Sequence, residues 1–163
     1  AAGTVETRPL SSNKVSIVES MLEVNLIAGL EPARSVCRRN VLDPAGGSLV
    51  FVSSIYGRVG MPGQISYCAA KGAVNSAVRA MAIELARRKI RVNSVSPGLV
   101  MTEMTEDALS VLSEDHVQRL HASHPLGIGT PEDVAQAVTF LLAPGTKWIT
   151  GTDLVIDGGF TAQ

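Results

Sequence analysis

The sequence predicts an α/β fold with a parallel sheet, because short apolar strands alternate with longer helical patterns along the chain. The predicted strands cover residues 48–52, 90–97 and 153–159. Alternation of this kind specifies parallel pairing with right-handed crossovers. The chain has 163 residues, 45% of them hydrophobic and 18% charged, which is enough for one domain with a sizeable core.

Composition excludes several classes of partner. The formal net charge of −1 gives no electrostatic basis for binding nucleic acid or an anionic membrane. The two cysteines, Cys37 and Cys68, form neither a C-x-x-C pair nor a disulfide framework, which suits a reducing compartment. No apolar run reaches the length of a membrane span, and the amino terminus resembles no signal or transit peptide. We therefore expect a cytoplasmic protein without nucleic-acid or membrane partners, with a matrix location as the alternative if a targeting segment has been lost.

The first long helical pattern begins near Val15. It places five apolar side chains on one side of the predicted helix: Val18, Met21, Leu22, Leu26 and Leu30. Asn25 lies inside this pattern, where asparagine is a poor helix former, so it is either a neutral polar position or present for its amide. Pro32 interrupts the pattern, and we expect it to kink the helix.

A polar cluster follows the first predicted strand. Ser53 and Ser54 stand at its carboxyl end, the edge at which parallel sheets bind ligands. After a glycine-rich loop, Tyr67 and Lys71 are spaced four residues apart on a predicted helix, so both project from one face. Because an ammonium beside a phenol favours the phenolate, we expect Lys71 to lower the pKa of Tyr67 below its ordinary value of about 10. Proton exchange with a carbonyl or alcohol oxygen becomes accessible to such a tyrosine.

The helix that carries Tyr67 is expected to continue to about Arg88, and its many alanines favour close packing. The predicted strand 90–97 follows, and Pro97 and Gly98 end it. Judged from the local sequence alone, these two residues form a turn and Thr102 caps the next helix.

The last third of the sequence is less informative until residue 130. His116, His121 and His124 lie in a polar, acidic segment, but no carboxylate or cysteine set completes a metal site, so we expect solvated histidines and no metal. The sequence TPED at 130–133 predicts a helix start, with Thr130 as the cap and acids in the first turn. No G-x-G-x-x-G phosphate loop opens a strand–helix unit in this sequence.

The block from Ser54 to Lys71 resembles the S-x12-Y-x3-K active-site motif of short-chain dehydrogenases/reductases. The resemblance extends through the chain and is closest to the 3-oxoacyl-(acyl-carrier-protein) reductase-like members. It implies a Rossmann-like doubly wound parallel sheet in three α/β/α layers. Residues 1–3 resemble the end of the family's mid-chain N-A-A-G turn. Residues 1–163 are therefore expected to be one partial domain with the active-site and substrate-lid portion, the amino-terminal dinucleotide-binding half being absent from this chain.

The same resemblance implies an NAD(P)(H)-dependent oxidoreductase that interconverts a ketone and a secondary alcohol, in particular a 3-oxoacyl thioester or related carbonyl reductase of fatty acid biosynthesis. In this family the tyrosine exchanges the proton, the serine orients the substrate oxygen, the lysine tunes the tyrosine and holds the nicotinamide ribose, and an asparagine in a V-N-L setting serves the proton relay. The matching catalytic positions are Asn25, Ser54, Tyr67 and Lys71, of which Ser54 and Tyr67 also bind substrate. The matching cofactor-binding positions, several of them in a P-G-x-V-x-T segment, are Ala2, Gly3, Tyr67, Lys71, Pro97, Gly98, Val100 and Thr102.

Several alternatives stay open at this level. The cofactor is NADP or NAD, because the residues that distinguish them belong to the half that this chain lacks. The substrate is a small carbonyl or alcohol compound, free or bound to a carrier, and the helices of Asn25 and Tyr67 imply a homodimer or homotetramer by resemblance. A second hypothesis treats the chain as a non-catalytic, truncated oligomerisation or regulatory module, because it lacks the phosphate loop.

Overall fold

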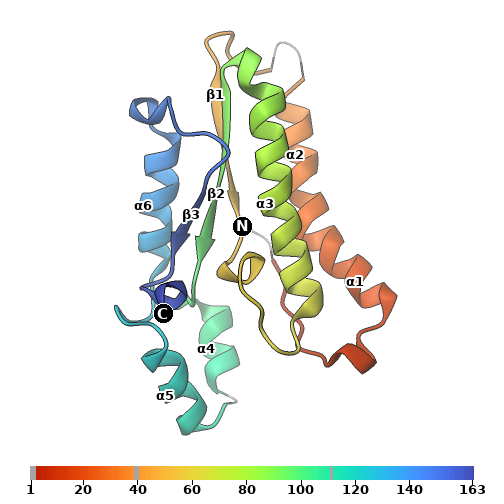
Figure 1. The fold of residues 1–163 in the computed structure, drawn as a ribbon, viewed down its shortest axis with the longest axis vertical. Coiled ribbons are helices and arrows are strands. Elements are labelled where there is room, and N and C mark those ends of the chain that lie inside the picture. Colours follow the sequence, from red (N-terminus) through yellow and green to blue (C-terminus); the bar gives the residue numbers. More distant parts are fainter. Residues whose placement is uncertain (1–2, 39–40, 111) are drawn as a thin grey trace.

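The computed structural model confirms the predicted α/β class. It describes residues 3–38, 41–110 and 112–163. Within these residues the sheet has three parallel strands, β1 (Gly47–Val52), β2 (Ile90–Pro97) and β3 (Asp153–Ile156), in the order β1-β2-β3. Figure 1 shows α1, α2 and α3 on one face of this open sheet and α6 on the other, which gives three layers.

The central strand β2 sets the register of the sheet. Gly47 of β1 lies beside Ile90, and Ser94 lies beside Asp153 of β3. The first two strands agree with the predicted boundaries to within one residue, but β3 is shorter than predicted and ends at Ile156. The chain turns there because Gly158 and Gly159 have φ angles of 59° and 92°, which an extended strand cannot contain.

The helix predicted from Val15 is interrupted before its proline. Helix α1 (Val15–Leu22) leads into a π-helical turn (Glu23–Ile27), and α2 (Ala28–Val36) follows directly. Pro32 lies inside α2 without ending it, and the irregular part of this helical stretch is instead the wider turn immediately upstream. Asn25 occupies the middle of that turn.

Helix α3 (Ile65–Leu85) forms the main core contact with the sheet, and a 3₁₀ turn extends it through Arg88 as predicted. Its buried face packs on the first residues of β2, and the residues of this core are Val74, Val78, Ala82, Leu85, Ile90 and Val92. Helix α6 (Pro131–Leu142) starts with the predicted capping box: Thr130 accepts a hydrogen bond from the Asp133 N–H, and the Asp133 carboxylate accepts one from the Thr130 N–H.

Two short helices, α4 (Glu103–Ser110) and α5 (Glu114–Ala122), lie beyond the carboxyl end of the sheet (Figure 1). The expectation of solvated histidines is wrong for His124, which is buried. Its Nδ1 lies 2.8 Å from the Leu120 carbonyl oxygen, and its Nε2 accepts a hydrogen bond from the Leu99 N–H at 3.2 Å. Because a carbonyl oxygen only accepts, Nδ1 carries the proton. The His116 side chain lies outside the described residues.

Within residues 3–38, 41–110 and 112–163, no three His, Cys, Asp or Glu side chains gather in an arrangement that could hold a metal ion. No helix in this described part of the chain combines the length and the apolar character that crossing a membrane requires.

Candidate active site

The carboxyl end of β1 carries the serines that the sequence singled out. Ser53 and Ser54 are both buried directly after the strand. The Ser53 hydroxyl donates a hydrogen bond to the Lys71 carbonyl at 3.1 Å, which ties the strand to α3. Ser54 begins a 3₁₀ turn (Ile55–Gly57), and its hydroxyl accepts a hydrogen bond from the Tyr56 N–H at 3.3 Å. We call residues 54–58 the serine turn.

Gly57 lets the serine turn cross α3 at close range. A Cβ atom on Gly57 would lie 2.9 Å from the carbonyl carbon and oxygen of Lys71 and 3.0 Å from Asn75 Nδ2. A side chain at this position would therefore push the turn away from the helix. Gly60 differs, because a Cβ there would meet nothing within 4 Å.

Helix α3 brings Tyr67 and Lys71 to the serine turn. The Lys71 ammonium lies 5.6 Å from the centre of the Tyr67 ring and donates a hydrogen bond to the Val52 carbonyl at 3.1 Å. Burial raises the pKa of Tyr67 above its ordinary value, and hydrogen bonding with Ser54 acts in the opposite direction without cancelling the effect. The expectation that Lys71 would lower the pKa of Tyr67 is thus wrong for this structure. The ammonium is bound by Val52, and desolvation of the phenol dominates.

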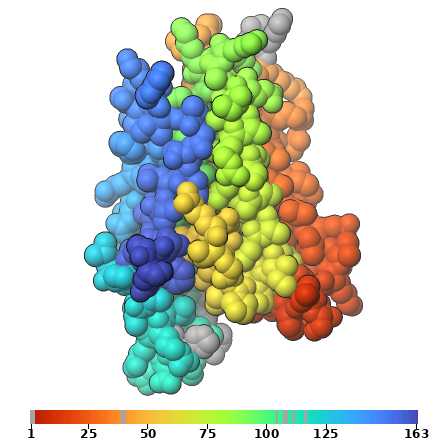
Figure 2. Space-filling view, viewed as in Figure 1, coloured from red at the N-terminus to blue at the C-terminus, as the bar shows by residue number. Residues whose placement is uncertain are grey.

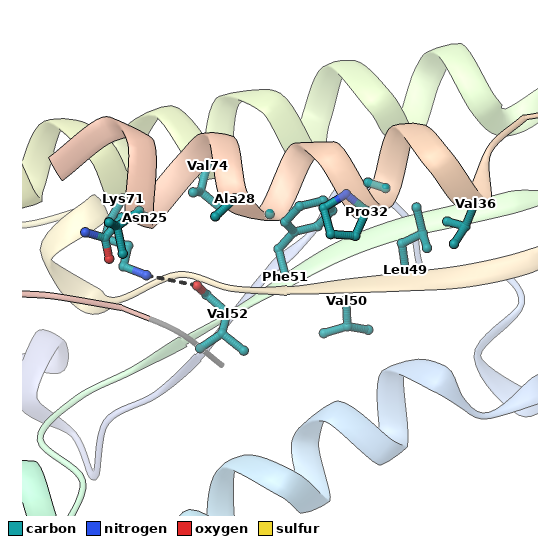
Figure 3. A pocket seen from close by; sticks show the side chains of 13 residues that line it. Asn25, Ala28, Pro32, Val36, Leu49, Val50, Phe51, Val52, Lys71 and Val74 are labelled. Atoms are coloured by element: carbon teal, nitrogen blue, oxygen red, sulfur yellow. Dashed lines mark hydrogen bonds between the residues drawn. The ribbon is translucent and has the colours of Figure 1, made fainter. Parts of the chain in front are cut away.

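Lys71 lies in an unusual environment for a cation. Its side chain belongs to a residue that is only 5% exposed, and burial lowers the pKa of its ammonium. In residues 3–38, 41–110 and 112–163, no carboxylate forms an ion pair with it. The side chain lines a cavity of about 430 Å³ between α2 and β1, whose other walls are mainly apolar (Figure 3).

Asn25 lines the same cavity from the π-helical turn (Figure 3). Its Nδ2 donates hydrogen bonds to the carbonyl oxygens of Thr4 at 3.0 Å and Met21 at 3.2 Å. Its Oδ1 is buried and accepts no hydrogen bond from any described residue. A Cβ atom on Gly3 would lie 3.3 Å from this oxygen, so the amino-terminal segment packs against Asn25. Ala2 lies outside the described residues.

The predicted cofactor segment follows β2, the strand next to β1, and so reaches the same edge of the sheet. Gly98 donates a backbone hydrogen bond to Ile156 at 2.9 Å, and a Cβ on it would lie 3.0 Å from Asp157 Cα. Val100 forms a β-bridge with Gly129. Close packing against Asp157 therefore explains the glycine at position 98, whether or not this residue also contacts a cofactor.

Thr102 is exposed and begins α4. Its hydroxyl accepts a hydrogen bond from the Thr105 N–H at 3.2 Å, so the helix cap expected from the local sequence is confirmed. Pro97, the last residue of β2, is half-buried.

Sequence reasoning missed one polar contact at the site. Arg58, at the end of the serine turn, donates a hydrogen bond from Nε to Asp153 Oδ2 at 2.5 Å. The two residues are 95 positions apart, and neither a charged residue in a loop nor an acid at the start of a strand indicates such a pair. The sequence offers no local signal for this pair, because Asp153 stands at the first position of its predicted strand, where an acidic residue is ordinary.

Comparisons with known proteins identify the family. The family model for enoyl-(acyl carrier protein) reductases matches residues 1–161. Human 3-oxoacyl-[acyl-carrier-protein] reductase is 41% identical over 160 residues, which cover 98% of this chain and 63% of the relative. The chain spans less than two thirds of the length of the first curated relatives that it matches.

Comparison with solved structures supports the same family. 4-Hydroxyisoleucine dehydrogenase in complex with NADH superimposes with a TM-score of 0.92 at 32% identity, over 100% of this chain and 67% of that protein. ElxO with NADP bound gives a TM-score of 0.81 at 30% identity, over 100% of this chain and 66% of that protein. One family accounts for these matches, for the parallel sheet and for the serine, tyrosine and lysine at the carboxyl end of β1. The chain belongs to the short-chain dehydrogenase/reductase family.

Proposed function

We propose that this chain carries the active site of an NAD(P)(H)-dependent oxidoreductase that interconverts a ketone and a secondary alcohol. The observation that carries this proposal is the convergence of Ser54, Tyr67 and Lys71 at one end of β1, where the Ser54 hydroxyl opposes the rise in the pKa of Tyr67. Two hydroxyl groups beside a buried ammonium suit an oxygen atom that gains or loses a proton.

In the reducing direction, Tyr67 gives the proton on its phenolic oxygen to the carbonyl oxygen of the substrate. The phenol holds its proton at neutral pH and can therefore act as the acid, and the burial that raises its pKa makes it a weaker one. Ser54 donates a hydrogen bond that orients the same oxygen. When bound, the nicotinamide cofactor supplies the hydride that the carbonyl carbon receives.

The residues around Lys71 fit a dinucleotide cofactor. The buried ammonium has no carboxylate partner among the described side chains, and Asn25 Oδ1 accepts no hydrogen bond within the same part of the chain. A ligand that presents hydroxyl groups, such as a nicotinamide ribose, would satisfy both. We assign cofactor contacts to Tyr67, Lys71 and Gly3.

Further cofactor contacts are assigned to the segment after β2, namely Pro97, Gly98, Val100 and Thr102, together with Ala2 near the amino terminus. The structures of relatives with NADH and with NADP support a nicotinamide dinucleotide without choosing between the two. We assign Asn25 to the proton relay, since its amide and Lys71 line one cavity.

We propose a 3-oxoacyl thioester, or a related small carbonyl compound, as the substrate. The name of the human relative supports this choice, although the chain covers only 63% of that protein. A homodimer or homotetramer and a cytoplasmic location stay predictions.

The test is hydride transfer by the purified protein. Acetoacetyl-coenzyme A is mixed with NADPH or NADH, and the loss of reduced-cofactor absorbance is followed. We expect turnover with at least one cofactor. Absence of turnover and of cofactor binding would contradict the proposal and favour the non-catalytic module.

A further inference from the structure

Asp153 is a buried carboxylate that three side chains hold in place. Its side chain is 7% exposed. Ser94 and Ser96 of β2 donate hydroxyl hydrogen bonds to Oδ1 at 2.9 Å and 2.8 Å, and Asn75 of α3 donates to Oδ2 at 3.2 Å. Because a buried carboxylate is costly unless its oxygens are paired, these contacts fix the group between β2, β3 and α3.

Arg58 meets this fixed group at two points. Its Nε donates to Asp153 Oδ2 at 2.5 Å, and its Nη2 donates to the Asp153 carbonyl oxygen at 2.7 Å. Two donors on one planar guanidinium set the direction of the side chain as well as its position. The Arg58 side chain is 46% exposed, so the pair adds little stability but much geometric definition.

Backbone hydrogen bonds connect Arg58 to the turn that contains Ser54. Arg58 donates its N–H to the Ile55 carbonyl at 2.8 Å, and Gly57 donates its N–H to the Ser54 carbonyl at 2.9 Å. Arg58 is therefore the last residue of the serine turn. Figure 2 shows this segment, in yellow, between α3 and the blue carboxyl-terminal part of the chain.

Asp153, the other residue of the pair, is in turn connected to α3. Asn75, which binds Asp153, lies one helical turn after Lys71, and a Cβ on Gly57 would contact both residues. The serine turn thus meets α3 directly at Gly57 and indirectly through Arg58 and Asp153. Loss of the indirect contact would leave the turn attached on one side only.

We propose that Arg58 and Asp153 are positioning residues that hold the Ser54 hydroxyl in place against Tyr67. The inference rests on the proposed function, since it assigns a purpose to the placement of Ser54. The pair itself touches neither substrate nor cofactor in this assignment.

The test compares Arg58→Met with Arg34→Met in the purified protein. Arg34 forms an exposed ion pair with Glu31, so its replacement controls for the loss of a surface guanidinium. We expect Arg58→Met to lower kcat about 10- to 100-fold through misplacement of Ser54, with the KM for cofactor unchanged. Arg58→Lys, which keeps the charge without the two-point contact, should restore only part of the activity.

A second readout does not need activity. The protein has two tyrosines, so the Cζ signals of ¹³C-labelled tyrosine can be assigned with Tyr67→Phe. Because hydrogen bonding with Ser54 lowers the pKa of Tyr67, Arg58→Met should move the Tyr67 titration to higher pH and leave Tyr56 in place. Arg34→Met should move neither.

An unchanged Tyr67 titration together with an unchanged kcat in Arg58→Met would overturn the inference. If the wild-type protein shows no turnover, the proposed function fails, while the tyrosine titration still decides whether the pair positions Ser54. Asp153→Asn and the double variant complete a cycle, in which the double variant should be no more impaired than the worse single variant. Additive losses would contradict action as a pair.

Discussion

The ammonium of Lys71 is hydrogen-bonded to the backbone carbonyl of Val52, the last residue of β1, at 3.1 Å. This contact holds a buried cation at the end of β1. It explains why the charge of Lys71 does not dominate the pKa of Tyr67, and it makes the proposed active site a local source of instability.

Lys71→Met should stabilise the fold while it removes activity. Burial lowers the pKa of Lys71, so the unfolded chain binds more protons than the native state at pH values between that lowered pKa and 10.5. Wild-type stability therefore rises with pH across this window. At neutral pH we expect the variant to gain about 1 kcal/mol in the free energy of unfolding, and to gain less as the pH approaches the upper limit.

Denaturant unfolding of both proteins at several pH values measures this effect. Lys147→Met, at an exposed position, is the matched control and should change stability little. A variant at position 71 that is less stable than wild type at neutral pH would refute the cost assigned to the buried ammonium.

Tyr67→Phe should remove turnover and keep the fold. The substitution deletes only the hydroxyl that would transfer the proton, and we expect kcat to fall roughly 10²- to 10⁴-fold. Tyr56→Phe is the control, because the Tyr56 ring packs edge-on against Tyr67 with ring centres 6.4 Å apart and has no assigned proton transfer. Steady-state kinetics and circular dichroism of both variants provide the measurement. Near-normal kcat in Tyr67→Phe would reject the role of the phenol.

Gly57→Ala should impair activity and stability where Gly60→Ala does not. The new Cβ at position 57 would meet the backbone of Lys71 at 2.9 Å, which a flexible side chain cannot relieve. We expect a loss of about 1–3 kcal/mol in unfolding free energy and a lower kcat, since the serine turn must move away from α3. At Gly60 nothing lies within 4 Å of the added atom. Equal thermal stability of the two variants would disprove the close approach of the serine turn to α3.

Thr130→Ala should weaken α6 by about 1 kcal/mol, because the capping box loses its hydroxyl. Thr139→Ala removes a hydroxyl from the interior of the same helix, where Thr139 only bonds back to the Ala135 carbonyl at 2.8 Å, and should cost less. Chemical denaturation ranks the two variants. Hydrogen bonds from Thr130 lower the pKa of Asp133, so the cap contributes above the ordinary carboxyl pKa and its contribution fades as the pH falls through the lowered value.

Local patterns predicted the elements well where the determinants are close in sequence. Strand 90–97 is predicted by its apolar alternation and by Pro97, and α6 by the TPED start at Thr130. The end of β3 was harder to place, because the left-handed backbone at Gly158 is invisible in an apolar pattern.

The candidate site shows the limit of spacing arguments. A separation of four residues puts Tyr67 and Lys71 on one face of α3, but the direction of the ammonium depends on a carbonyl 19 positions away. Burial of His124 depends in the same way on its contact with Leu99, 25 positions away. The spacing therefore predicted that Tyr67 and Lys71 share a helix face. Their pKa values and hydrogen-bond partners depend on contacts between distant parts of the chain, which the spacing does not show.

The end position of β1 in the sheet has a consequence for amide hydrogen exchange. Gly47 and Ser53 donate their N–H groups to Lys89 and Val95 of the β2 segment, at 3.2 Å and 2.8 Å. Successive amides of a strand point to opposite sides, so those of Ser48, Val50 and Val52 face away from β2. Exchange should divide β1 into slow odd-numbered and fast even-numbered amides. Slow exchange at the even-numbered positions would instead reveal a further backbone paired along this edge.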